Sequence, residues 1–239
     1  MSRDIEPRFD PSQISEADIE YQRNHRNMRN WFWYFVIGGL ILLPLFHLYL
    51  GLRVVGRKPP RSGPLLIICN HRNNLDPFAM GVACPHRALT FMAKVELFRN
   101  ALLRFLLPRW GTYPIIRQTN DVRSVRILMQ LLKQDEAVVL FPEGTRSRTG
   151  EVGPFNSGFV RIAVRQRVPI VLAAIENTEK ALPRGSQFPV PRVGVTVTFD
   201  EPVELHEHYG KKLTGDEADA IADSLRQRLI TILSEESFA

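Results

Sequence analysis

Short apolar runs alternate with amphipathic stretches over most of the chain, beginning near residue 65. Six of these runs have the length of buried strands and are bounded by turn residues. They cover residues 65–69, 88–92, 112–116, 137–141, 169–175 and 193–199. Apolar residues also recur every three or four positions from Val122 to Leu132, which predicts a core-facing helix, with Asp121 as its candidate N-cap. The alternation predicts an α/β fold with a mixed, largely parallel central sheet flanked by helices.

The longest apolar run, residues 31–52, lies before this alternating region. It contains no Lys, Arg, Asp or Glu and has about the length of a helix that crosses a bilayer. Gly38, Gly39 and Pro44 interrupt the run, so two short helices are as compatible with it as one span. Aromatic residues at its start and arginines on both flanks are typical of a membrane interface, and a buried core helix is the alternative. We expect a membrane-associated helix or helical hairpin.

This run divides the chain into three predicted parts. Residues 1–30 are polar and carry charges of both signs, residues 31–52 form the apolar segment, and residues 53–239 form the main domain. The start of that domain, residues 53–64, combines basic, Pro and Gly residues and is typical of a linker. Residues 95–110 are rich in Leu and Phe with interspersed arginines, a pattern that suits either a membrane-surface helix or a core helix. A further helix is expected after Thr214.

The composition narrows the class of protein without identifying it. The 239 residues are 44% hydrophobic and 23% charged, which is typical of a folded globular chain. The net charge of +6 favours anionic partners, which include nucleic acid, anionic lipid and phosphorylated substrates. Cys69 and Cys84 are the only cysteines and have no zinc-ligand spacing, so neither a disulfide framework nor a structural metal is indicated. We expect the main domain to face the cytoplasm.

The first stretch with candidate chemistry is Asn70-His71-Arg72-Asn73-Asn74-Leu75-Asp76-Pro77, which follows a predicted strand. On a single helix, His71 and Asp76 would point about 140° apart, so they meet only if the chain turns between them. A carboxylate bonded to one imidazole nitrogen leaves the other free to accept a proton, as a general base requires. Alternatively, Asp76 before Pro77 is a helix cap and His71 a polar residue at a strand end.

The second stretch is Phe141-Pro142-Glu143-Gly144-Thr145-Arg146-Ser147, which follows another predicted strand. Arg146 offers planar paired donors for a phosphate, and Gly144 permits unusual backbone angles in a turn. Glu143 would repel an anion, so we expect it to orient Arg146 or to accept a hydrogen bond from a hydroxyl. The segment therefore predicts a phosphate-binding turn, and an ordinary surface turn is the alternative.

Together the two stretches resemble the glycerolipid acyltransferase family typified by 1-acylglycerol-3-phosphate acyltransferase. Its N-H-x-x-x-x-D block matches at residues 70–76, and its F-P-E-G-T-R block matches at 141–146. Residues 111–117 resemble its G-x-x-x-I-x-R block, residues 94–97 its K-x-E-L block and residues 168–171 its V-P-I-V strand. The chain departs from common family residues at Asn73, Asn156 and Leu172, positions that bear on the acceptor more than on the reaction.

The resemblance implies an enzyme that transfers a fatty acyl group from acyl-CoA or an acyl carrier protein to lysophosphatidic acid, forming phosphatidic acid. His71 is then the general base and Asp76 its partner, in a catalytic domain at residues 53–239. The implied substrate-binding residues are Lys94, Arg117, Glu143, Gly144, Thr145 and Arg146. Backbone N–H groups near residues 70–76 are candidate donors to the oxyanion. No cofactor or metal is implied, and membrane lipid is the expected partner, with the domain on the cytoplasmic face.

Other functions share part of these features. An acyltransferase for another lysophospholipid or for a glycerol phosphate shares the same motifs. A metal-dependent hydrolase would need ligands beyond His71 and Asp76, and His206-Glu207-His208 lacks the spacing of a known ligand set. A basic protein that binds nucleic acid or membrane without catalysis needs only the Arg and Lys excess, but no nucleic-acid-binding motif is present.

Overall fold

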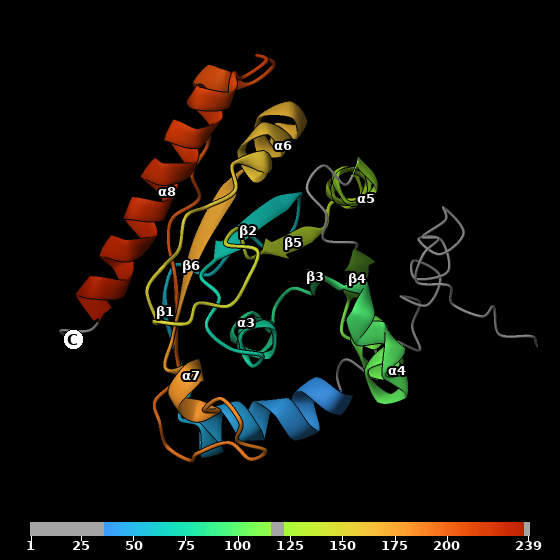
Figure 1. Ribbon diagram of the computed structural model, residues 1–239, viewed down its shortest axis with the longest axis vertical. Helices are drawn as coiled ribbons and strands as arrows, with labels where there is room; N and C mark the ends of the chain where they lie inside the picture. Colours follow the sequence, from blue (N-terminus) through green and yellow to red (C-terminus); the bar gives the residue numbers. More distant parts are fainter. Residues whose placement is uncertain (1–35, 116–121, 237–239) are drawn as a thin grey trace, which may run out of the picture.

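The computed structural model describes residues 36–115 and 122–236 and is built around a seven-stranded sheet (Figure 1). Its strand order is β1-β7-β6-β2-β5-β3-β4. Only the β6–β7 pair is antiparallel among the strands described, so the predicted mixed, largely parallel sheet is confirmed. The strands are β1 (Arg53–Gly56), β2 (Leu65–Cys69), β3 (Leu89–Lys94), β4 (Thr112–Ile115), β5 (Ala137–Leu140), β6 (Ile170–Glu176) and β7 (Thr196–Phe199).

Helices cover both faces of the sheet (Figure 1). One face packs against α3 and the helical segment before β1, and the other packs against α5, α6 and α8. Strand β2 is buried along its whole length because its alternate side chains enter these two separate cores. The helices are η1 (Val36–Leu42), η2 (Leu45–Tyr49), α3 (Asp76–Ala83), η3 (Val95–Arg99), α4 (Ala101–Arg109), α5 (Val122–Lys133), α6 (Gly158–Gln166), α7 (Thr178–Ala181), η4 (His206–His208) and α8 (Gly215–Glu236).

All six predicted strands are present as β2 to β7, but the predicted linker at residues 53–64 is partly wrong. Its first four residues form β1, an edge strand paired in parallel with β7. Three of the four residues of β1 are exposed, so the strand lacks the continuous apolar run that marks the buried strands. The rest of the segment, from residue 57 to 64, contains no helix or strand.

The apolar segment is helical in the part that the structure describes, and its turns run from Val36 to Tyr49 without a break. Pro44 lies inside these turns with helical angles, φ −61° and ψ −42°. The wide π-type turns on both sides of Pro44 accommodate the proline without a break, although the sequence was equally compatible with two short helices. No helix within residues 36–115 and 122–236 combines the length and apolar character needed to cross a membrane.

Two helical regions differ from expectation in what they bury. Helix α4 has no buried residue, so the core-helix alternative for this part of residues 95–110 is wrong. In α5, Leu128 and Leu132 are buried as predicted, whereas Val122 and Val125 are exposed. The proposed cap of α5, Asp121, lies outside the described residues. The predicted C-terminal helix is present as α8, whose buried side chains join the second core.

The sheet order brings three loops to one edge. Strands β2, β5 and β6 are parallel neighbours, with β2 in the middle. Their carboxyl ends therefore face the same direction, where ligands commonly bind in such sheets. The loops that begin at Asn70, Phe141 and Asn177 leave the sheet at this edge.

Candidate active site

The loop between β2 and α3 makes the turn that the spacing of His71 and Asp76 requires. His71 follows the strand end, Asp76 is the first residue of α3, and the His71 Nδ1 and Asp76 Oδ2 atoms lie 2.7 Å apart. The carboxylate can only accept, so Nδ1 carries the shared hydrogen and Nε2 is the nitrogen left to accept a proton. The imidazole stacks on Phe141, with ring centroids 4.2 Å apart. Only 12% of its side-chain surface is exposed.

The Asp76 carboxylate is completely buried and accepts hydrogen bonds from several groups. Its Oδ2 atom accepts from the backbone N–H groups of Arg72 and Asn73, at 2.7 and 2.8 Å, as well as from His71. Its Oδ1 atom accepts from the Thr178 hydroxyl at 2.5 Å. Four donors fix the carboxylate, which offsets the cost of burying its charge. Asp76 therefore does not cap α3, whose N-cap is Leu75.

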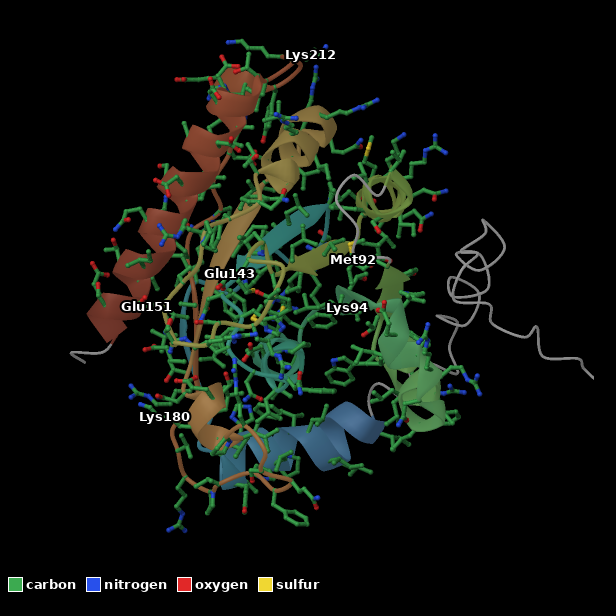
Figure 2. The ribbon with its side chains drawn as sticks, viewed as in Figure 1. Met92, Lys94, Glu143, Glu151, Lys180 and Lys212 are labelled. Carbon is green, nitrogen blue, oxygen red and sulfur yellow. The ribbon has the colours of Figure 1, made fainter. Side chains whose placement is uncertain are left out.

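The loop after β5 packs directly against the His71 loop. The backbone N–H of Ser147 donates to the His71 carbonyl oxygen at 2.8 Å. Glu143 accepts from the His71 backbone N–H at 2.8 Å and from the Gly153 N–H at 3.0 Å. The side chain of Glu143 thus braces the two loops, whereas we expected it to orient Arg146 or accept from a hydroxyl. In Figure 2 it lies near the middle of the molecule.

The third loop at this edge supplies contacts that the sequence did not predict. Asn70 is buried, and its side-chain amide donates to the Ile175 carbonyl and accepts from the Ile175 N–H, both at 2.8 Å. Asn73 donates to the carbonyl of Leu182 at 2.7 Å. With Thr178, these bonds tie the His71 loop to the end of β6 and to α7. No motif marks Thr178 or Ile175, because their role depends on the strand order.

The predicted phosphate-binding residues are distributed along the same sheet edge. Gly144, Thr145 and Arg146 are exposed in the turn beside His71, and Gly144 has a φ of +70°, which favours glycine. Lys94 is exposed at the end of β3, two strands from β2, a separation of roughly 10 Å at ordinary strand spacing. Figure 2 shows Lys94 on the α4 side of the molecule. Arg117 lies outside the described residues.

A comparison with protein-family models identifies the family to which these loops belong. The family model described as Acyltransferase matches residues 51–176, a range that contains both the His71 loop and the Phe141–Arg146 turn. The chain belongs to the acyltransferase family. The predicted family and the predicted class of enzyme, an O-acyltransferase, are thereby confirmed.

Individual relatives of this acyltransferase carry a consistent name. The human 1-acyl-sn-glycerol-3-phosphate acyltransferase alpha is 32% identical over 222 residues, which cover 90% of this chain and 73% of the relative. A chloroplastic 1-acyl-sn-glycerol-3-phosphate acyltransferase of Brassica napus is 28% identical, and the match spans 72% of this chain and about half of that protein, 47%. The 1-acyl-sn-glycerol-3-phosphate acyltransferase of Bacillus subtilis is 32% identical over 53% of this chain and 63% of the relative.

A solved structure shares the fold. The crystal structure of the 1-acyl-sn-glycerophosphate acyltransferase PlsC from Thermotoga maritima superposes with a TM-score of 0.61 at 21% identity. The superposition covers 90% of this chain and 82% of the other. The α/β architecture with its largely parallel sheet is therefore common to both proteins.

The backbone donors of the His71 loop are already used in this acyltransferase. The N–H groups of His71, Arg72 and Asn73 donate to Glu143 and Asp76. Our expectation that backbone N–H groups near this turn bind the oxyanion is therefore wrong for these three residues. Each has one hydrogen to donate, and a carboxylate of Glu143 or Asp76 accepts it.

The two thiols of the chain are poor candidates for a covalent acyl intermediate. Burial and the nearby Asp76 carboxylate raise the pKa of the Cys69 thiol well above its ordinary value. Burial raises the pKa of Cys84 to about 12. Because the thiolate is the nucleophile, both cysteines are inert at neutral pH. Neither thiol is therefore suited to carry the acyl group.

Proposed function

We propose that this acyltransferase moves a fatty acyl group from acyl-CoA or an acyl carrier protein to the free hydroxyl of lysophosphatidic acid, forming phosphatidic acid for phospholipid synthesis. The observation that carries the proposal is the His71–Asp76 pair, joined at 2.7 Å beside the turn that contains Arg146. The names of the human and Bacillus subtilis relatives support lysophosphatidic acid as the acceptor. We further propose that the chain works at the cytoplasmic face of a membrane, where this lipid resides.

The proposed reaction needs no covalent enzyme intermediate. Nε2 of His71 takes the proton of the acceptor hydroxyl, whose oxygen attacks the thioester carbonyl carbon. The tetrahedral intermediate collapses as the carbon–sulfur bond breaks, and the departing thiolate receives the proton from His71. The Asp76 carboxylate stabilises the imidazolium between these two transfers and fixes the ring orientation. The new ester and a free thiol are the products.

Binding of the acceptor phosphate is assigned to the cationic residues at this edge. Arg146 is exposed in the turn that contacts the His71 loop, which supports the proposal that it holds a phosphate on the same side of the sheet as the imidazole. Lys94 and Arg117 are proposed as further phosphate ligands, and Gly144 and Thr145 as the turn that presents Arg146. Binding of the phosphate orients the glycerol hydroxyl toward the thioester. The attack then proceeds nearly as an intramolecular reaction instead of a collision between two free molecules.

The direct test is an acceptor panel assayed with both acyl donors. Purified protein in mixed micelles is expected to acylate lysophosphatidic acid in preference to lysophosphatidylcholine, glycerol 3-phosphate and monoacylglycerol. Product formation from acyl-CoA and from acyl carrier protein is measured separately, which identifies the donor. A higher kcat/KM on another acceptor would replace lysophosphatidic acid in the proposal, and no acyl transfer to any acceptor would refute it.

Arg146→Ala is expected to raise the KM for lysophosphatidic acid by roughly tenfold or more, the effect of losing one hydrogen bond between charged groups. The change should leave the KM for monoacylglycerol unaltered, because that acceptor has no phosphate. Arg165→Ala on α6 removes the same charge from an exposed position and serves as the control. Equal losses on both acceptors would show that Arg146 does not bind the phosphate.

A further inference from the structure

The loop after α7 presents apolar and cationic side chains together. Phe188 is 78% exposed and Val190 is 43% exposed, although both are large and apolar. Residues 180–192 contain three cations and no Asp or Glu. We call the exposed residues at this end of the molecule the Phe188 surface, which comprises Leu48, Tyr49, Lys180, Arg184, Phe188, Val190 and Arg192.

Hydrogen bonds hold the Phe188 surface in one arrangement. The backbone N–H of Arg192 donates to the Tyr49 carbonyl oxygen at 2.6 Å, and the Tyr49 hydroxyl donates to the Pro189 carbonyl at 3.0 Å. The N–H of Val190 donates to the Ala181 carbonyl at 2.7 Å. These bonds join the loop to η2 on one side and to α7 on the other. Figure 1 shows the loop and α7 at the lower end of the molecule. The backbone that carries Phe188 and Val190 is therefore held in place by these bonds.

Helix η2 extends the apolar part of this surface. Leu48 is 80% exposed and Tyr49 is 42% exposed, while Phe46 on the same helix is completely buried. The buried side anchors the helix to the domain, so the exposed side has no role in the core. Exposed apolar side chains can enter the acyl-chain region of a bilayer, and cations beside them can bind the phosphates of anionic lipids.

The Phe188 surface is directly connected to the candidate active site. Asn73, in the His71 loop, donates to the Leu182 carbonyl at 2.7 Å, and the Arg184 guanidinium donates to the Ser147 carbonyl at 2.8 Å. Figure 2 shows Lys180 on α7 at the same end of the molecule. A membrane bound to this surface therefore lies beside both loops of the site.

We propose that the Phe188 surface docks on anionic lipid bilayers, with Phe188 inserted among the acyl chains and Lys180, Arg184 and Arg192 against lipid phosphates. The proposal deepens the proposed function, on which it rests, by naming a membrane contact that extends from the end of the apolar segment, at Leu48 and Tyr49, to residues 180–192. Docking in this orientation delivers an acceptor to His71 directly from the bilayer. The lipid does not have to leave the membrane to react.

The test measures binding of the full chain to phosphatidylcholine vesicles with and without phosphatidylserine, by co-sedimentation. Phe188→Ser is expected to weaken partitioning roughly tenfold, since one large apolar side chain no longer inserts. Val122→Ser on α5 removes a similarly exposed apolar side chain, 60% exposed, from another element and should bind like the unmodified protein. Lys180→Gln with Arg192→Gln should weaken binding roughly tenfold on anionic vesicles only.

Activity separates this proposal from the proposed function. Phe188→Ser should retain the wild-type rate on lysophosphatidic acid dispersed in detergent micelles and lose rate on the same lipid embedded in vesicles. Unchanged vesicle binding by Phe188→Ser, or an equal loss in Val122→Ser, would overturn the docking surface while leaving the reaction intact. Absence of acyl transfer in micelles by the unmodified protein would instead overturn the function, without altering the binding result.

Discussion

Replacing His71 with alanine is expected to lower kcat for acyl transfer by at least about 10²–10⁴-fold, the usual contribution of a general base. The hydroxyl of the acceptor would then attack without losing its proton to the enzyme. KM should change little, because the proposed phosphate ligands lie on other residues. The measurement is a steady-state assay with lysophosphatidic acid and acyl-CoA.

The chain should remain folded in this variant. The Asp76 carboxylate keeps three donors, from Arg72, Asn73 and Thr178, so no buried charge is left unpaired. The lost stacking on Phe141 leaves a small gap in a partly buried position, which costs about 1–3 kcal/mol of unfolding free energy. Thermal unfolding followed by circular dichroism checks this expectation.

The matched control is His208→Ala, which removes an imidazole from the η4 turn outside the site. It should leave kcat and KM unchanged. If His71→Ala keeps full activity, the general-base mechanism is wrong. If His208→Ala abolishes activity as well, the loss in His71→Ala does not support a general base at that position.

The strands of this fold were predictable because most of them are buried on both faces. A strand such as β2 has only apolar residues from Leu65 to Cys69, so its hydrophobic run stands out in the sequence. The edge strand β1 gives no such signal, since three of its four residues are exposed and Gly56 precedes a basic, Pro-containing stretch. Its presence depends on pairing with β7, which lies more than a hundred residues later in the chain.

The helical regions show a different limit of prediction. Apolar periodicity does not reveal which surface a helix will contact, and α4 illustrates this because its Leu- and Phe-rich sequence buries no residue. In α5 the buried face is shifted from the predicted stripe, toward Ile127, Leu128, Leu131 and Leu132. Packing against the rest of the fold decides which side of a helix is buried, and the spacing of apolar residues predicts that side only approximately.

At the candidate site, the sequence predicted the residues within each motif but not the contacts between loops. His71 and Asp76 were assigned from their spacing and family pattern, and they lie within hydrogen-bond distance. The catalytic role of this pair remains a prediction. Thr178 is 102 residues from Asp76 in the chain, and its hydroxyl reaches the carboxylate only because β6 lies beside β2. The prediction for Glu143 is wrong for the same reason, since its partner His71 N–H comes from the neighbouring loop.

Asp76→Asn is expected to reduce kcat by roughly 10²–10⁴-fold while the fold is kept. The amide has the shape of the carboxylate, so its oxygen accepts from the Arg72 and Asn73 N–H groups and its NH₂ group faces the Thr178 hydroxyl. That hydroxyl can rotate to accept a hydrogen bond. His71 then keeps a partner for Nδ1, but the partner is neutral and no longer stabilises the imidazolium formed during the reaction.

A purely structural role for Asp76, in which it only anchors the loop, predicts a different outcome from a role in which its charge assists His71. If the residue only anchors the loop, Asp76→Asn retains most of the anchoring bonds and most of the activity, whereas Asp76→Ala loses both because all four donors to the carboxylate lose their acceptor. If the charge itself assists His71, Asp76→Asn loses activity at nearly unchanged thermal stability. Measuring kcat and the unfolding midpoint for both variants therefore shows whether Asp76 contributes its charge or only its shape.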